Sequence, residues 1–135
     1  MKKWQIVFRP DYYATPMSFW VHIPLDGEVW RDAKQFAPPL PKAVPGKGFP
    51  LLLIRFLGVE LEFASVEEAE HFWEVIAQKH LRSTRELSRK RTEDYGPNRH
   101  WLSRLPSKLK PWKQREKLIP ILQEGIVGLR SAYQD

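Results

Sequence analysis

The residues best suited to a chemical task in this chain are a run of lysines and arginines near its middle. Residues 79–117 carry thirteen Lys or Arg against four Asp or Glu, a local balance of +9, whereas the stretches on either side are slightly acidic. Lysine and arginine side chains bind phosphate oxygens, and arginine does so in a bidentate manner. Because the net charge of +6 comes wholly from this stretch, the sequence predicts contact with a polyanion such as DNA or RNA.

The residues that we expect to contact phosphates form two groups, one before and one after a break at Gly96-Pro97. Aromatic residues lie among them, and a flat ring can stack on the bases of a single strand. The predicted nucleic-acid-binding residues are Arg82, Arg85, Arg89, Lys90, Arg91, Arg99, Trp101, Arg104, Lys108, Lys110 and Lys113. The alternative is a solvated basic surface, because cations collect at the C-terminal ends of helices in any case.

Motifs for catalysis, metal binding or nucleotide binding are weak in this sequence. Glu68 and His71 form a single Glu-x-x-His pair, whereas carboxylate-bridged metal sites use that spacing twice. No His lies beside a nucleophile motif, and Gly46-Lys47-Gly48 lacks the Lys-Ser/Thr end of a phosphate-binding loop. We therefore expect a non-enzymatic protein without a cofactor or a metal ion.

Length and composition predict one domain over residues 1–135, with enough apolar residues for a core. The absence of cysteine excludes disulfides and fits a reducing compartment. No apolar run approaches the roughly 20 residues of a membrane span, and no secretory signal follows the first lysines. These features predict a cytoplasmic protein without a membrane partner.

The N-terminal half has the pattern of a small sheet. Alternating apolar residues predict strands over residues 3–9, 18–25, 51–57 and 59–64. The last two would form a hairpin around Leu57-Gly58, unless they are one long strand with a bulge. Residues 26–49 form a proline-rich loop, which is a surface connection, a flap or an arm for a partner.

The C-terminal half has the pattern of helices. Ser65 and Glu68 form a capping box, in which Glu68 would bind the Ser65 amide, at the start of a predicted helix over about 66–90. A short helix is expected over 99–105 and a long one over about 111–133, with a kink or a fresh start at Pro120. The long helix carries a near-heptad seam, made of Trp112, Arg115, Ile119, Leu122, Ile126, Leu129 and Tyr133.

The fold class predicted from this order is α+β, with a small, mostly antiparallel sheet of about four strands packed against two main C-terminal helices. Two further functional interpretations stay open. One is a protein-interaction module that binds an acidic protein or a second copy of itself through the seam or the proline-rich segment 38–50. The other is a small-ligand pocket between sheet and helices, lined by Trp4, Trp20, Phe56 or Trp73.

Overall fold

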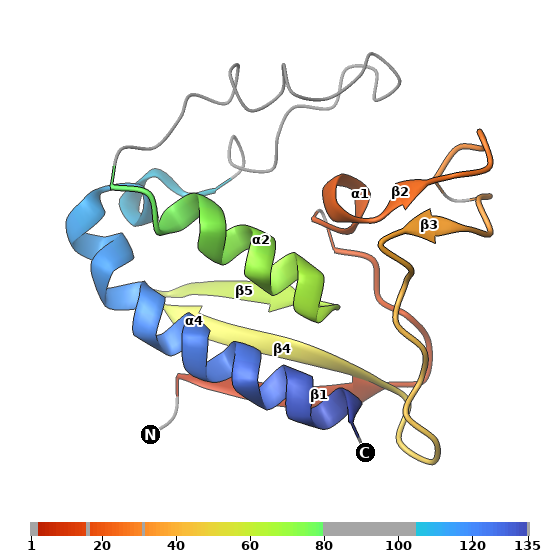
Figure 1. Cartoon of the computed structure of the whole chain (residues 1–135). Coiled ribbons are helices and arrows are strands. Elements are labelled where there is room, and N and C mark those ends of the chain that lie inside the picture. The colour runs from red at the N-terminus through yellow and green to blue at the C-terminus, as the bar shows by residue number, and fades with distance from the viewer. Residues whose placement is uncertain (1–2, 16, 31, 80–104, 135) are drawn as a thin grey trace.

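The structure, a computed structural model, describes residues 3–15, 17–30, 32–79 and 105–134. It is an α+β fold in which a three-stranded sheet is covered on one face by two helices, with a separate two-stranded sheet to one side (Figure 1). The elements are β1 (Trp4–Arg9), α1 (Ser18–Val21), β2 (Ile23–Pro24), β3 (Phe36–Ala37), β4 (Phe49–Phe56), β5 (Val59–Phe63), α2 (Val66–Ile76), the 3-10 helix η3 (Ser107–Leu109) and α4 (Trp112–Tyr133). The predicted fold class is confirmed.

The main sheet has the strand order β1–β4–β5, with both pairs antiparallel. Leu57 and Gly58 connect β4 to β5 and both have positive φ, 52° and 76°. Two consecutive residues of this kind make the turn that best suits a tight hairpin. The predicted hairpin is therefore confirmed, and the alternative of one long bulged strand is wrong.

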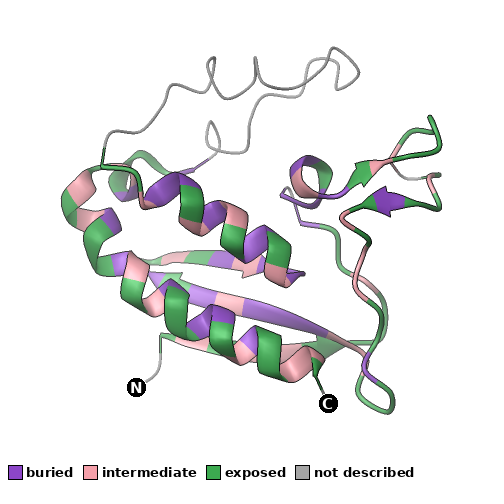
Figure 2. Cartoon of the chain, viewed as in Figure 1, coloured by how far each residue is buried: buried purple, intermediate pink, exposed green. Residues whose placement is uncertain are grey.

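Helix α4 packs along β4 and β1, and α2 packs beside it on β5. Figure 2 shows that buried residues line the sides of both helices that face the sheet and run along β4. The seam is confirmed as the buried side of α4, where Leu122 and Leu129 have no exposed surface. A fresh helix start at Pro120 is wrong, because α4 continues through this exposed residue.

The predicted strand over 18–25 is wrong for most of its length. Residues 18–21 form α1, and only Ile23 and Pro24 belong to a strand, paired with β3. Phe19 and Ile23, which the alternation placed inside, are exposed, whereas Thr15, Ser18 and His22 are completely buried. The polar side chains at these three- and four-residue spacings turn inward because they have hydrogen-bond partners there, described below.

Helix α2 begins where the sequence predicts. Ser65 is its N-cap and accepts a hydrogen bond from the amide of Glu68 at 3.1 Å. The Glu68 carboxylate accepts from the amide of Ala64 rather than from that of Ser65. The helix ends at Ile76, so the prediction that it continues is wrong for residues 77–79, and its remainder to 90 lies outside the described residues.

The proline-rich stretch 26–49 contains little regular structure, as predicted. It includes β3, a bridge between Val44 and Gly48, and the first residue of β4. The predicted helix over 99–105 lies outside the described residues except for its last position. Among the described residues, no helix has both the length and the apolar character needed to cross a bilayer.

Candidate nucleic-acid interface

Arg115 is the residue that organises the described part of the basic stretch. It lies on the first turns of α4 and is only 3% exposed. Its guanidinium donates hydrogen bonds to four main-chain carbonyls, those of Ile76 (2.8 Å), Gln78, Lys79 (3.0 Å) and Lys110 (2.7 Å). Burial lowers the pKa of this side chain from its usual value, yet arginine remains protonated in proteins. Arg115 is thus bound to the fold and is not available to a phosphate.

The hydrogen bonds from Arg115 to these four carbonyls, which we call the Arg115 bracket, explain why α2 ends where it does. The last carbonyls of a helix have no partner within the helix. Here the Ile76 carbonyl and those of the two residues after the C-cap are satisfied by a cation from another helix, which also suits the helix dipole. The same guanidinium binds the carbonyl just before α4. The chain at Lys79 and the chain at Lys110 are therefore held on one side chain.

Four lysines of the basic stretch meet at this end of the molecule. Lys79 follows α2, Lys108 lies in η3, Lys110 follows η3 and Lys113 lies in the first turn of α4. Apart from Lys110, which is half-buried, these residues are exposed. No ion pair joins any of the four to another described residue.

A fifth lysine approaches the same end from the first strand. The Lys3 ammonium lies over the ring of Phe56, the last residue of β4, at 5.7 Å from its centroid. The Lys108 ammonium lies beside the following turn, 3.8 Å from the point where a Cβ on Gly58 would be. We call Lys3, Lys79, Lys108, Lys110 and Lys113 the basic end. In Figure 1 it is the left side of the view, where α2 ends and α4 begins.

Acidic residues are few at this end in the described part of the chain. Glu60 pairs with Arg55 at 3.1 Å across the β4–β5 hairpin. Glu116 is exposed on α4, and it is the one acid among the described residues of 79–117. The exposed acids of α2 are Glu67 in its first turn, Glu70 in its middle and Glu74 in its last turn. The basic end therefore contains some acids, but lysines outnumber them there.

Of the predicted binding residues, Lys108, Lys110 and Lys113 are described, and the structure brings them together. The others lie outside the described residues: Arg82, Arg85, Arg89, Lys90, Arg91, Arg99, Trp101 and Arg104. The stretch that contains them begins after Lys79 and returns before Leu105, so it starts and ends at the basic end. Lys3 was not among the predicted binding residues because it is distant in sequence from the basic stretch.

A second polar cluster lies inside the protein, around the carboxylate of Glu68. The two oxygens accept from the hydroxyls of Thr15 (2.6 Å), Tyr12 and Ser18 (both 2.8 Å), and from Ser65 and the Ala64 amide. Glu68 itself has no exposed surface. Burial and the nearby negative charge raise the pKa of the Tyr12 hydroxyl above its usual value. The cluster ties the segment before and within α1 to the first turn of α2.

His22 and Ser65 extend this cluster and form a contact that sequence reasoning did not foresee. The Nδ1 of His22 lies 2.7 Å from the carbonyl of Pro38, and its Nε2 lies 2.8 Å from the Ser65 hydroxyl. A carbonyl only accepts, so Nδ1 carries a proton. A Ser-His pair of this geometry can activate a nucleophile, but both residues have no exposed surface. The pair therefore serves the fold.

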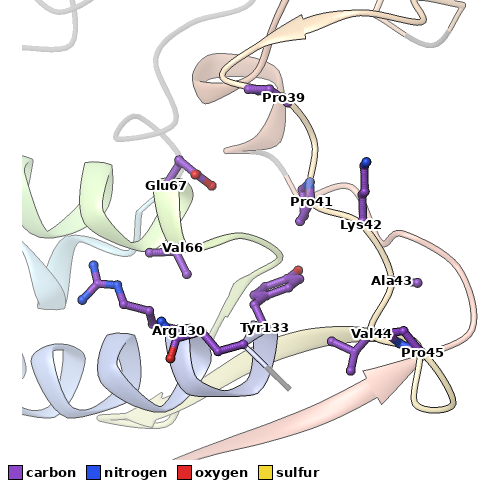
Figure 3. A pocket seen from close by; sticks show the side chains of 11 residues that line it. Pro39, Pro41, Lys42, Ala43, Val44, Pro45, Val66, Glu67, Arg130 and Tyr133 are labelled. Atoms are coloured by element: carbon purple, nitrogen blue, oxygen red, sulfur yellow. The ribbon is translucent and has the colours of Figure 1, made fainter.

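A cavity of about 370 Å³ lies between the proline-rich segment 39–45 and the adjoining ends of α2 and α4 (Figure 3). Val66, Glu67, Arg130 and Tyr133 form the wall opposite the prolines. Two of its polar side chains are engaged within the fold: Arg130 pairs with Glu70 at 2.8 Å, and the Tyr133 hydroxyl donates to the carbonyl of Ala64 at 2.6 Å. Burial raises the pKa of that hydroxyl. The other polar side chains that line the cavity are Lys42, Glu67 and Gln134.

The four aromatic residues predicted to line a ligand pocket occupy different places in the fold. Trp20 and Phe56 are buried in the core, and Trp4 and Trp73 pack against its edge. Trp4 and Trp73 border two separate shallow hollows on the outer side of α4. The Trp4 ring packs closely against α4, because a Cβ on Gly128 would lie 2.6 Å from it.

Comparisons of the chain with protein-family models, with curated proteins and with solved structures found no match. Function therefore has to be argued from the geometry above.

Proposed function

We propose that this protein binds nucleic acid, without catalysis, by contacting phosphates through its basic end. The observation that carries the proposal is the Arg115 bracket, which brings together lysines that are some thirty residues apart in sequence. Five lysines from three parts of the chain lie at this end, where they outnumber the acids. Such a concentration of positive charge favours a polyanion and raises its rate of association.

The other eight predicted residues lie outside the described part of the chain, between Lys79 and Leu105. Seven of the eight are arginines or lysines. A contact surface of this composition positions a nucleic-acid backbone without reading its sequence. We therefore expect affinity to depend strongly on salt and weakly on base order.

The test is fluorescence anisotropy with labelled DNA and RNA, single- and double-stranded, over a salt series. In the triple variant K108E/K110E/K113E, log affinity should fall less steeply with log salt, by about 3 in slope for duplex DNA and about 2 for a single strand. The matched control K34E/K42E/K47E makes the same change of charge in the exposed residues of the proline-rich stretch.

The control variant should keep most of the slope and most of the affinity at low salt. Equal losses in the two triple variants would mean that net charge, not the basic end, governs binding. No binding of any nucleic acid by the wild-type protein at low salt would refute the proposal, and capture of an acidic protein would then be the function to pursue.

A further inference from the structure

Trp112 occupies a position unlike that of the other described tryptophans. Trp20 is in the core, Trp4 and Trp73 pack against it, and Trp30 lies between the rings of Phe19 and Phe36. Trp112 is the first residue of α4, remains partly exposed, and is not part of the core cluster. Among the described residues, the charged or aromatic group in contact with its ring is Arg115.

The contact with Arg115 fixes the tryptophan ring. The two residues are three positions apart on α4, so their side chains lie on neighbouring turns of one face. The guanidinium carbon lies 5.1 Å from the ring centroid, within the range of a cation–π interaction. Because Arg115 is itself held by four carbonyls, it has little freedom to move. The indole therefore rests on a rigid support, and ordering it for a ligand has a small entropic cost.

Lysines of the basic end lie close to Trp112 along the chain. Lys113 follows Trp112 directly, and the carbonyl of Lys110 binds the guanidinium on which the ring rests. Proteins that bind single strands combine aromatic platforms with cations that contact the backbone. In a duplex the bases are paired and stacked on one another, so an aromatic side chain cannot stack on them without disrupting the helix.

We infer that the basic end binds single-stranded nucleic acid, with a base stacked on the exposed part of the Trp112 indole while the lysines contact flanking phosphates. This inference rests on the proposed function and specifies the class of nucleic acid. It adds a contribution to affinity that salt does not screen, because stacking involves no counterion release.

The test compares two labelled ligands with the same number of phosphates, an oligothymidylate and an abasic oligonucleotide of equal length. The wild-type protein should bind the oligothymidylate more tightly by about 5- to 150-fold, the range that one stacked base contributes. In W112A this preference should disappear, while affinity for the abasic ligand stays unchanged. W112F keeps a ring and should retain much of the preference.

The lysine variant K108E/K110E/K113E should show the opposite behaviour, with weaker binding of both ligands, a smaller salt slope and the same preference for bases. Equal binding of the two ligands by the wild-type protein would overturn the inference while leaving phosphate contact intact. An equal loss of both ligands in W112A would also overturn it, since it would show that the ring only supports the fold. Failure of the wild-type protein to bind either ligand at low salt would refute the proposed function itself.

Discussion

Substitution of Arg115 tests whether one buried cation holds both the fold and the basic end together. Arg115→Met removes the guanidinium and keeps an apolar side chain of similar length, and Arg115→Lys keeps the charge but loses the planar fork. Four carbonyls lose their donor in the first variant. An ammonium in place of the fork cannot reach all of them.

The loss of stability depends on which of the four carbonyls can accept a hydrogen bond from water once the guanidinium is removed. A hydrogen bond from a charged donor contributes about 1.5–3 kcal/mol. Gln78 and Lys79 are exposed residues, so water can replace the guanidinium at their carbonyls, whereas Ile76 is completely buried and Lys110 is half-buried. We therefore count two lost bonds and expect Arg115→Met to cost about 3–6 kcal/mol, and Arg115→Lys about 2 kcal/mol. These are large parts of a typical domain stability of about 5–15 kcal/mol.

The assay is urea denaturation followed by circular dichroism, with amide hydrogen exchange at residues 77–79 as the local measurement. The matched control is Arg130→Met on the same helix, where an exposed arginine pairs with Glu70. Exposed ion pairs contribute at most about 1 kcal/mol, so this variant should differ little from the wild type. If Arg115→Lys were as stable as Arg130→Met and equally protected at residues 77–79, the bracket would not be what ends α2.

Two further predictions concern the buried polar cluster. Glu68→Gln should lower the free energy of unfolding by about 3 kcal/mol, because the hydroxyl of Tyr12 and the Ala64 amide lose a charged acceptor, and the exposed neighbour variant Glu67→Gln should cost about 0.5 kcal/mol. Equal urea midpoints for the two variants would contradict this. The pKa values of Tyr12 and Tyr133 are raised by burial above the usual 10.0, so both hydroxyls stay protonated in the folded state after they ionise in the unfolded one. The contribution of these two tyrosines to stability should therefore be constant below about pH 10 and fall above it by about 2.7 kcal/mol per pH unit. In Tyr133→Phe the slope measured by urea unfolding at several alkaline pH values should be about half as steep, and an unchanged slope would exclude this tyrosine as a source.

The elements predicted well are those whose determinants are local. The β4–β5 hairpin depends on alternation and on two residues that accept positive φ, and all of this lies within fifteen residues. The beginning of α2 depends on Ser65 and Glu68, three positions apart. The long helix depends on a seam repeated over its whole length. In each case the information needed lies within the element itself.

The predictions that failed concern elements determined from a distance. Residues 18–25 alternate like a strand, but Ser18 is turned inward by Glu68, fifty residues further along the chain. Nothing near Ser18 in the sequence indicates that acceptor. The end of α2 is determined in the same way, by a guanidinium thirty-nine residues away. Tertiary partners override local propensity at both places.

The burial of Arg115 could nevertheless have been predicted from the sequence, and this burial connects the fold to the proposed function. It is the one charged residue among the seven positions of the seam, so the periodicity that predicts a buried helix face also predicts a buried cation. A buried guanidinium needs several acceptors, and the unpaired carbonyls at the end of a neighbouring helix provide them without a second buried charge. An arginine in the apolar seam of one helix therefore predicts that a second helix ends beside that arginine. The segment that follows the second helix must then begin at the same place. In this protein the chain that follows α2 begins the basic stretch with Lys79, so the residue that satisfies the helix end also holds the main chain of Lys79 and that of Lys110 on one side chain.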